Sequence, residues 1–247
     1  MKIIKLDAVN STNSFLKQLA QEDALESGAT VVAKTQWKGK GQMGKQWVSE
    51  DSKNLLCSVF FSFENLLNSQ QIYLNYAVSL AVFEVLKSFH LPKLTIKWPN
   101  DILSENKKVA GILIENTLQG AVIKSAVVGV GINANQSVFP AHVKHASSIQ
   151  NITNQRVDLE DLLLQFRKAL LKNIALLKAE KFAALEAAYL AVLYKKNTPT
   201  MFKNCRTEVL FMGAIQGVSP SGKLQIQLAD ESLKEFGIKE VAMATQL

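Results

Sequence analysis

The chain has 247 residues, enough to bury a substantial core in one large or two unequal domains. Hydrophobic residues make up 48% and charged residues 20%, which argues against wholesale disorder and a fibrous repeat, and no apolar run is long enough to span a bilayer. Residues 1–7 are too short and too charged for a signal sequence, and the two cysteines lack a CxxC spacing, so we expect a cytoplasmic protein with free thiols.

The first part of the chain predicts strands interrupted by helices. Alternating polar and apolar residues predict a strand at 2–6, and helix-capping residues at 10–13 precede apolar side chains at helical spacing. Apolar runs, the first of them β-branched, predict further strands at 30–33 and 54–63. Apolar residues that recur every three or four positions then predict a long helix over 70–89.

The rest of the chain predicts a hairpin, a helical segment and a small β region. Strands are expected at 94–98, 109–116 and 121–130, and the last two should form a hairpin because Leu-Gln-Gly separates them. The pattern from 158 to about 195 is helical. Short strands broken by Gly, Ser and Pro follow at 207–228, which indicates an all-β appendage of roughly 50 residues.

The formal net charge of +7 is concentrated before residue 198, because 198–247 contains five basic and five acidic residues. Lysines crowd around a glycine-containing loop that joins two predicted strands; they are Lys34, Lys38, Lys40, Lys45 and Lys53. A local cluster of this kind suits the phosphates of a small ligand, and it also suits an acidic protein partner through electrostatic steering.

This glycine loop, residues 36–47, reads Gln-Trp-Lys-Gly-Lys-Gly-Gln-Met-Gly-Lys-Gln-Trp. Its three glycines allow the backbone to approach a ligand closely, and its lysines add ammonium groups, so the loop is typical of an anion-binding concavity. It is neither a Walker loop nor a dinucleotide fingerprint, since it enters a strand and not a helix. Taken alone, the loop is explained equally well as a solvated turn.

A second segment, Lys-Trp-Pro-Asn-Asp at 97–101, ends in Asp101, a carboxylate that could ligate Mg²⁺ together with substrate phosphates. The alternative is that Asn100 and Asp101 only cap a turn. Lys107 and Lys108 follow at the start of an apolar strand, where a lysine either neutralises a carboxylate or phosphate in a pocket or protects a sheet edge.

A third segment, Gly-Val-Gly-Ile-Asn at residues 129–133, ends the predicted hairpin with small residues and one amide. The amide of Asn133 could read the edge of an adenine with one donor and one acceptor. A tight turn explains the segment as well.

Together these segments resemble bacterial biotin protein ligases in their order and rough spacing; they are 11–13, 36–47, 97–101, 108–112 and 131–133. The resemblance covers the whole chain, and Trp-Pro-Asn-Asp with the downstream Lys-x-Ala-Gly is its most specific part. It implies an α+β fold: a mixed β-sheet backed by helices, like that of class II aminoacyl-tRNA synthetases, in a catalytic domain of residues 1–197. A small SH3-like β-barrel would follow at 198–247.

The resemblance implies that biotin and ATP react to give biotinyl-AMP and pyrophosphate, with Mg²⁺ as cofactor. An acceptor lysine then takes the biotin and AMP is released. The partner would be a biotin carboxyl carrier domain of acetyl-CoA carboxylase or another biotin-dependent carboxylase. Because only ten residues precede Ser11, we expect no N-terminal DNA-binding domain and hence no DNA partner. No membrane partner is expected, and a homodimer is compatible with the family.

The resemblance also assigns roles to residues. Biotin would contact the polar residues and glycines of four segments, namely Ser11, Thr12, Asn13, Gln36, Gly39, Lys40, Gly41, Lys108 and Gly111. The nucleotide would contact Gln42, Met43, Gly44, Trp47, Asn100 and Asn133, with Trp47 stacked on adenine. The catalytic residues would be Lys108, Lys40 and Asp101. The Lys-x-Ala-Gly spacing selects Lys108 over Lys107, and Asp101 would hold the Mg²⁺.

The glycine loop departs from the family pattern, which usually has Arg at the positions of Lys40, Gln42 and Lys45. Lysine keeps the charge but not the bidentate fork, and Gln42 has neither. We therefore hypothesise that this chain holds the adenylate less tightly, unless Lys38 or Lys45 compensates.

Two other functions agree with parts of the sequence. A lipoate ligase or octanoyltransferase would share the layout and the acceptor-lysine chemistry, although the glycine loop and Trp-Pro-Asn-Asp favour biotin. A nucleic-acid-binding module would explain the basic charge and the small β region, and it would not need Lys108.

Overall fold

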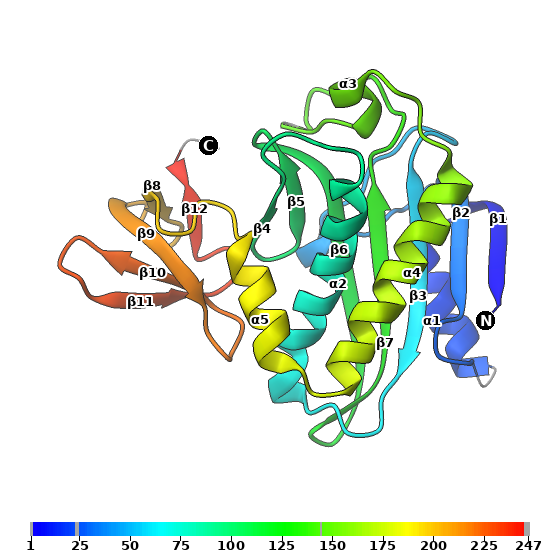
Figure 1. The fold of residues 1–247 in the computed structure, drawn as a ribbon, viewed down its shortest axis with the longest axis horizontal. Helices are drawn as coiled ribbons and strands as arrows, with labels where there is room; N and C mark the ends of the chain where they lie inside the picture. The colour runs from blue at the N-terminus through cyan, green and yellow to red at the C-terminus, as the bar shows by residue number, and fades with distance from the viewer. Residues whose placement is uncertain (1, 23–24, 144, 245–247) are drawn as a thin grey trace.

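We describe a computed structural model of the chain, which covers residues 2–22, 25–143 and 145–244 (Figure 1). Its main body is a seven-stranded sheet in the order β1-β2-β3-β7-β6-β5-β4. The strands are β1 (Ile3–Val9), β2 (Thr30–Gln36), β3 (Leu55–Ser62), β4 (Thr95–Lys97), β5 (Asp101–Ser104), β6 (Lys107–Gln119) and β7 (Val122–Ile132). β1 and β2 are parallel and the other neighbours antiparallel, so the sheet is mixed.

Helices cover both faces of this sheet. On one face, α2 (Gln71–Lys87) and α4 (Leu159–Lys178) pack together over the large core, as Figure 1 shows. On the other face, α1 (Thr12–Glu22) buries Leu16 against a smaller cluster that includes Phe60. Successive side chains of β3 point to opposite faces, which is why both faces of this central strand need an apolar cover.

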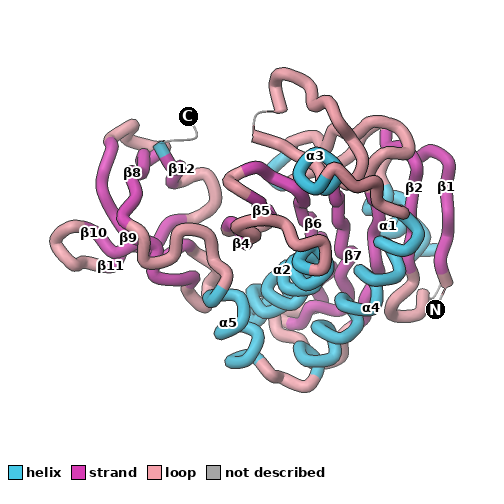
Figure 2. The backbone as a smooth tube through the Cα atoms, turned by 45° about the horizontal axis from the view of Figure 1, so that its top comes forward, coloured by secondary structure: helices cyan, strands magenta, loops and turns pink. Residues whose placement is uncertain are grey.

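The C-terminal strands form a second, fully antiparallel sheet in the order β11-β10-β9-β8-β12. They are β8 (Pro199–Asn204), β9 (Leu210–Val218), β10 (Leu224–Leu228), β11 (Leu233–Phe236) and β12 (Val241–Met243). Helix α5 (Phe182–Ala191) and the segment after it connect the two sheets (Figure 2). The prediction of a mixed sheet backed by helices is thus confirmed, and the C-terminal sheet is compatible with an SH3-like barrel. The domain boundary at 197/198 stays a prediction.

Three local details were not predicted from the sequence. The helical pattern from 158 to about 195 is divided into two helices, because Glu180, with a φ of 55°, interrupts it between α4 and α5. Residues 101–104, for which no strand was predicted, form the short strand β5 between β4 and β6. A short helix, α3 (Ile149–Thr153), had no expected counterpart. Within the described residues, no helix is both long and apolar enough to cross a membrane.

Candidate active site

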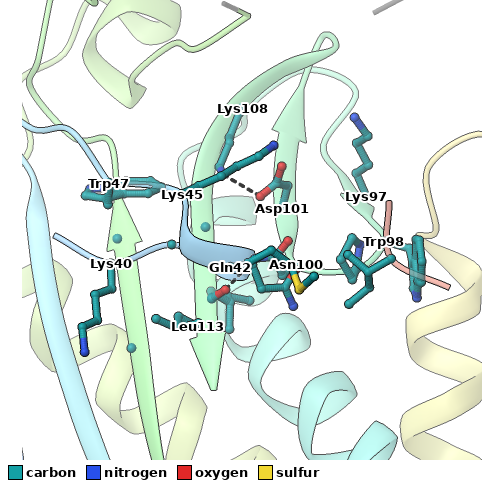
Figure 3. A pocket seen from close by; sticks show the side chains of 18 of the residues that line it. Lys40, Gln42, Lys45, Trp47, Lys97, Trp98, Asn100, Asp101, Lys108 and Leu113 are labelled. Carbon is teal, nitrogen blue, oxygen red and sulfur yellow. Dashed lines mark hydrogen bonds and ion pairs between the residues drawn. The ribbon is translucent and has the colours of Figure 1, made fainter. Parts of the chain in front are cut away.

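A cavity of about 660 Å³ lies between the large sheet, the glycine loop and the C-terminal sheet (Figure 3). Its walls come from the start of α1, the ends of β2 and β3, the central strands β6 and β7, and the segment 97–101. The cavity therefore brings together all five sequence segments that resemble the ligase family.

The floor of the cavity, which we define as Ser11, Thr12 and Asn13 together with Ser58, is a buried polar cluster. Ser58 does not itself line the cavity but hydrogen-bonds to Thr12 and Asn13. The first three residues are 2–4% exposed and surround the start of α1, and Ser58 on β3 is fully buried. Gln36 joins the floor to the glycine loop, because its Oε1 accepts hydrogen bonds from the Thr12 backbone N–H at 2.7 Å and the Thr12 hydroxyl at 3.0 Å. The floor is uncharged and suits a neutral polar ring system.

Asn13 is fixed from three sides. Its Nδ2 donates to Glu115 Oε2 at 2.9 Å, and its Oδ1 accepts from the Ser58 hydroxyl at 2.6 Å. Gly129 of β7 passes so close that any β-carbon there would overlap the Asn13 side chain. The sequence analysis missed Ser58, for which the available signal was a small polar residue inside the apolar run 54–63, and it gave Gly129 no role of its own.

The glycine loop folds as a small hairpin held mainly by its own backbone. Gly41 N–H donates to the Lys45 carbonyl at 2.7 Å, and Trp47 N–H donates to the Gly39 carbonyl at 2.9 Å. Gly39 has to be glycine, since a β-carbon would lie 2.5 Å from the Trp47 carbonyl oxygen. The side chains of Lys40 and Lys45 are exposed, so the loop presents positive charge at the cavity.

The Trp47 indole lies flat over the central strands. A β-carbon on Gly111 of β6 would come 2.7 Å from the ring, and one on Gly131 of β7 would come 2.5 Å from it. The Lys108 ammonium lies 5.2 Å from the ring centroid. Within the described part of the chain, the buried indole Nε1 has no hydrogen-bond partner.

Lys108 and Asp101 form the charged centre of the cavity. Lys108 Nζ and Asp101 Oδ1 are 2.6 Å apart, and the two side chains are only 34% and 25% exposed (Figure 3). Asn100 fixes the preceding turn, since its Nδ2 donates to the Ile112 carbonyl at 2.7 Å. Lys107 is exposed and does not line the cavity, so the structure brings Lys108, and not its neighbour, to this centre.

Further lysines raise the positive charge near this pair. Burial lowers the pKa of the Lys97 ammonium, and the positive charges of Lys108, Lys45 and Lys195 lower it further, while Asp101 raises it. A cavity with this excess of ammonium groups can bind a ligand with several negative charges.

The C-terminal sheet forms part of the cavity wall, which sequence reasoning missed. The lining residues are Phe202, Cys205, Leu224, Ile238, Lys239, Val241, Ala242 and Met243. Lys239 also donates to the Met43 carbonyl of the glycine loop at 3.5 Å. No motif marked these residues, because only the packing of the two sheets brings them to the cavity.

Most predicted site residues line the cavity, and three do not. Gly39 and Gly44 line a neighbouring depression of about 520 Å³ on the glycine loop. Asn133 is 3% exposed, and its Nδ2 donates to the Lys108 carbonyl at 3.3 Å and the Ser147 carbonyl at 3.0 Å. It therefore supports the backbone of Lys108, and its contact with adenine stays a prediction.

Among the described residues that line the cavity, Asp101 is the single carboxylate that could ligate a metal ion. The described residues contain no group of three or more His, Cys, Asp or Glu side chains placed to hold a metal. Asp101 alone fits Mg²⁺ only where ligand phosphates and water complete the coordination, as is usual for this ion.

Comparisons with known proteins agree with this geometry. A family model described as the Biotin/lipoate A/B protein ligase family matches residues 6–133. The chain is 30% identical over 225 residues to the biotin--[acetyl-CoA-carboxylase] ligase of Paracoccus denitrificans, covering 89% of this chain and 91% of that protein. It is 33% identical over 174 residues to the bifunctional ligase/repressor BirA of Bacillus spizizenii, covering 67% of this chain. The chain spans about half of that relative, 53% of its length.

Solved structures show the same overall arrangement. The biotin protein ligase from Aquifex aeolicus in complex with biotin and ATP superposes with a TM-score of 0.78 at 28% identity, covering 98% of this chain and 97% of that chain. Its apo structure superposes with a TM-score of 0.72 at 26% identity, covering 98% of both chains. The similarity therefore includes the C-terminal sheet as well as the segment matched by the family model.

Proposed function

Because this chain belongs to the biotin/lipoate A/B protein ligase family, we propose that it is an ATP-dependent biotin protein ligase. The observation that carries the proposal is the Lys108–Asp101 pair, 2.6 Å apart, between an uncharged polar floor and a lysine-bearing loop. This arrangement matches a substrate with a neutral ring system at one end and a carboxylate at the other. The solved relative from Aquifex aeolicus holds biotin and ATP, the two substrates that this reaction requires.

Biotin would place its ureido ring on the floor and its carboxylate near Lys108. The hydroxyls of Ser11 and Thr12 and the amide of Gln36 supply donors and acceptors in fixed positions, so little ordering is left for the moment of binding. The Lys108 ammonium would offset the negative charge of the carboxylate and of the adjacent α-phosphate. Asp101 would orient Lys108, a role that its ion pair supports.

In the first step, a carboxylate oxygen of biotin attacks the α-phosphorus of ATP and the bond to the bridging oxygen of pyrophosphate breaks. The products are biotinyl-AMP and pyrophosphate. The chain contributes mainly by positioning both substrates and by stabilising charge with Lys108, Lys40 and Lys45. Mg²⁺ bound at Asp101 and the phosphates would supply further charge neutralisation.

In the second step, a neutral lysine amine of the acceptor attacks the carbonyl carbon of the mixed anhydride, and AMP leaves. An amide joins biotin to the acceptor. The glycine loop would cover the intermediate and exclude water from the anhydride, which would otherwise hydrolyse. We propose a biotin carboxyl carrier domain as acceptor, which the name of the Paracoccus denitrificans relative supports.

The nucleotide would lie toward Trp47 and the C-terminal sheet. The free indole Nε1 and the flat ring of Trp47 are suited to an adenine, provided the ring leaves its present contact with Gly111 and Gly131 or presents its other face. Gln42, Met43 and Asn100 line the same cavity and are proposed as further contacts.

A transfer assay tests the function directly. The wild-type protein, ATP and biotin should label an apo carrier domain, whereas lipoate in place of biotin should not be incorporated. Lys108→Ala should lower the rate of biotinyl-AMP formation by about 100-fold or more, because it removes the charge that stabilises the reacting oxygens. Lys107→Ala is the matched control and should retain activity. Wild-type protein that labels no carrier domain would overturn the proposal.

A further inference from the structure

The outer side of the glycine loop carries an exposed tryptophan next to an exposed lysine, at Trp37 and Lys38. The Trp37 side chain is 64% exposed, although indoles are usually largely buried in folded chains. Neither residue lines the main cavity, whereas Lys45 does, so Lys38 is not placed to compensate for Gln42 there and neither residue has a role in the proposed chemistry. A large exposed tryptophan is typical of a protein interaction site, because Trp is enriched among the residues that contribute most to binding, and an adjacent lysine adds a charge that can select a partner.

The backbone of this exposed pair is held in a fixed position. Trp37 N–H donates to the Val9 carbonyl at 3.1 Å, and Lys38 N–H donates to the Asn10 carbonyl at 2.9 Å. The Trp37 carbonyl accepts from Gln46 Nε2 at 3.4 Å. The backbone is thus tied both to the end of β1 and to the second half of the loop. Binding of a partner here therefore costs little backbone conformational entropy.

Lys38 lies at the edge of the depression of about 520 Å³ beside the cavity. This depression and the main cavity share Lys40, Gly41, Lys45, Gln46 and Leu113. A protein seated on the outer side of the loop is therefore adjacent to the place where the adenylate would form. Within the described residues, the ion pairs involve other lysines, so the charges of Lys38, Lys40 and Lys45 are available to a partner.

We propose that Trp37 and Lys38 form the docking site for the acceptor domain, a partner with acidic side chains around its target lysine. The proposal rests on the biotin ligase function. A target lysine is itself positive and would be repelled by Lys38, Lys40 and Lys45, so only an acceptor that surrounds it with carboxylates gains from this surface. The indole then anchors the complex by burying apolar area at the centre of the contact.

Separate measurement of the two half-reactions tests this docking site. The full-length Trp37→Ala/Lys38→Glu double variant should form biotinyl-AMP at the wild-type rate, measured by ATP–pyrophosphate exchange. With an apo biotin carboxyl carrier domain as probe, its KM for the carrier should rise about tenfold or more, because a central aromatic anchor and a favourable charge are lost. Hydroxylamine, a small nucleophile that needs no docking, should capture biotin equally well from both proteins. The single Lys38→Glu variant should also lose part of the salt dependence of carrier kcat/KM.

Leu164→Ala/Lys168→Glu is the matched control, since it removes one exposed apolar residue and reverses one exposed lysine on α4, outside both hollows. This control variant should have wild-type values for ATP–pyrophosphate exchange, for the carrier KM and for capture by hydroxylamine. An unchanged carrier KM in the Trp37/Lys38 variant overturns the docking site, as does an equal fall in exchange and transfer. The docking site is also overturned if the wild-type protein is a dimer, the variant is a monomer, and both have the same KM for the carrier. Absence of exchange and transfer in wild-type protein would instead refute the ligase function.

Discussion

On the floor of the cavity, Ser11, Thr12 and Asn13 are only 2–4% exposed, and the side chains of Thr12 and Asn13 are hydrogen-bonded to Gln36, Ser58 and Glu115. On the glycine loop, Lys40 and Lys45 are exposed, and neither takes part in an ion pair of the described residues. The floor is uncharged and built from two segments that are distant in the sequence, residues 11–13 and Ser58. The loop is charged, and residues 39–47 are held mainly by hydrogen bonds within the loop. This difference leads us to expect that the preformed floor selects the vitamin and that the positive loop retains the charged intermediate.

The largest difference should be in thiol labelling, between Cys57 beside the floor and Cys205 in the C-terminal part of the chain. Cys57 is 1% exposed next to the floor, and burial raises the pKa of its thiol to about 12, so almost no thiolate is present at neutral pH. Cys205 is exposed on the C-terminal sheet. We expect iodoacetamide to modify Cys205 and to react with native Cys57 about 1000-fold more slowly than with an ordinary thiol, as read by mass spectrometry. In denaturant both should react, and native labelling of Cys57 would show that the floor is open.

A glycine-to-alanine substitution should destabilise the protein more beside the floor than on the glycine loop. Gly129→Ala places a methyl group inside the Asn13 side chain and should lower the free energy of unfolding by about 2–3 kcal/mol, with weaker biotin binding. Gly44→Ala meets no atom within 4 Å, but its φ of 76° is unfavourable for alanine, so about 1 kcal/mol should be lost. Denaturant unfolding and biotin calorimetry measure both. Equal losses would mean that the floor is no more rigid than the loop.

The smallest effect concerns retention of the intermediate. Gln42 lines the cavity without a charge, so Gln42→Arg should slow the release of biotinyl-AMP by about three- to tenfold through a charge-assisted contact with phosphate. Gln42→Lys is the control that adds charge without the bidentate fork, and its effect should be smaller. The measurement is release in the absence of acceptor. A Gln42→Arg variant that leaks as fast as wild type refutes the idea that this position sets the tightness of the adenylate.

Much of the fold could be predicted because it depends on local pattern. The apolar run at 54–63 contains the central strand β3, because a strand buried on both faces is apolar at successive positions. The segment at 70–89 contains the helix α2, because a buried helix face places apolar residues at every third or fourth position. Strand β5 could not be predicted, because Pro99 and Asn100 signal a turn and only pairing with β4 and β6 makes residues 101–104 extended.

The candidate site divides in the same way. Glycine spacing predicted the loop as an anion-binding segment, since close backbone approach needs glycine at particular positions. Lys108 was predicted through the resemblance to the ligase family, whose Lys-x-Ala-Gly motif this chain contains. The contacts of Ser58 and Gly129 with Asn13 could not be predicted, because nothing local distinguishes a serine or glycine of a buried strand that faces Asn13 from one that only fills space.

The sequence by itself indicated the order of the elements and the anion-binding character of the glycine loop, because local spacing and residue type carry that information, and its resemblance to the ligase family favoured Lys108 over Lys107. Only the tertiary structure decided that Asp101 pairs with Lys108, that Asn133 supports the Lys108 backbone, and that the C-terminal sheet closes the cavity. The physical reason is that these contacts depend on strand register and on how two sheets pack, and both are set by the core as a whole.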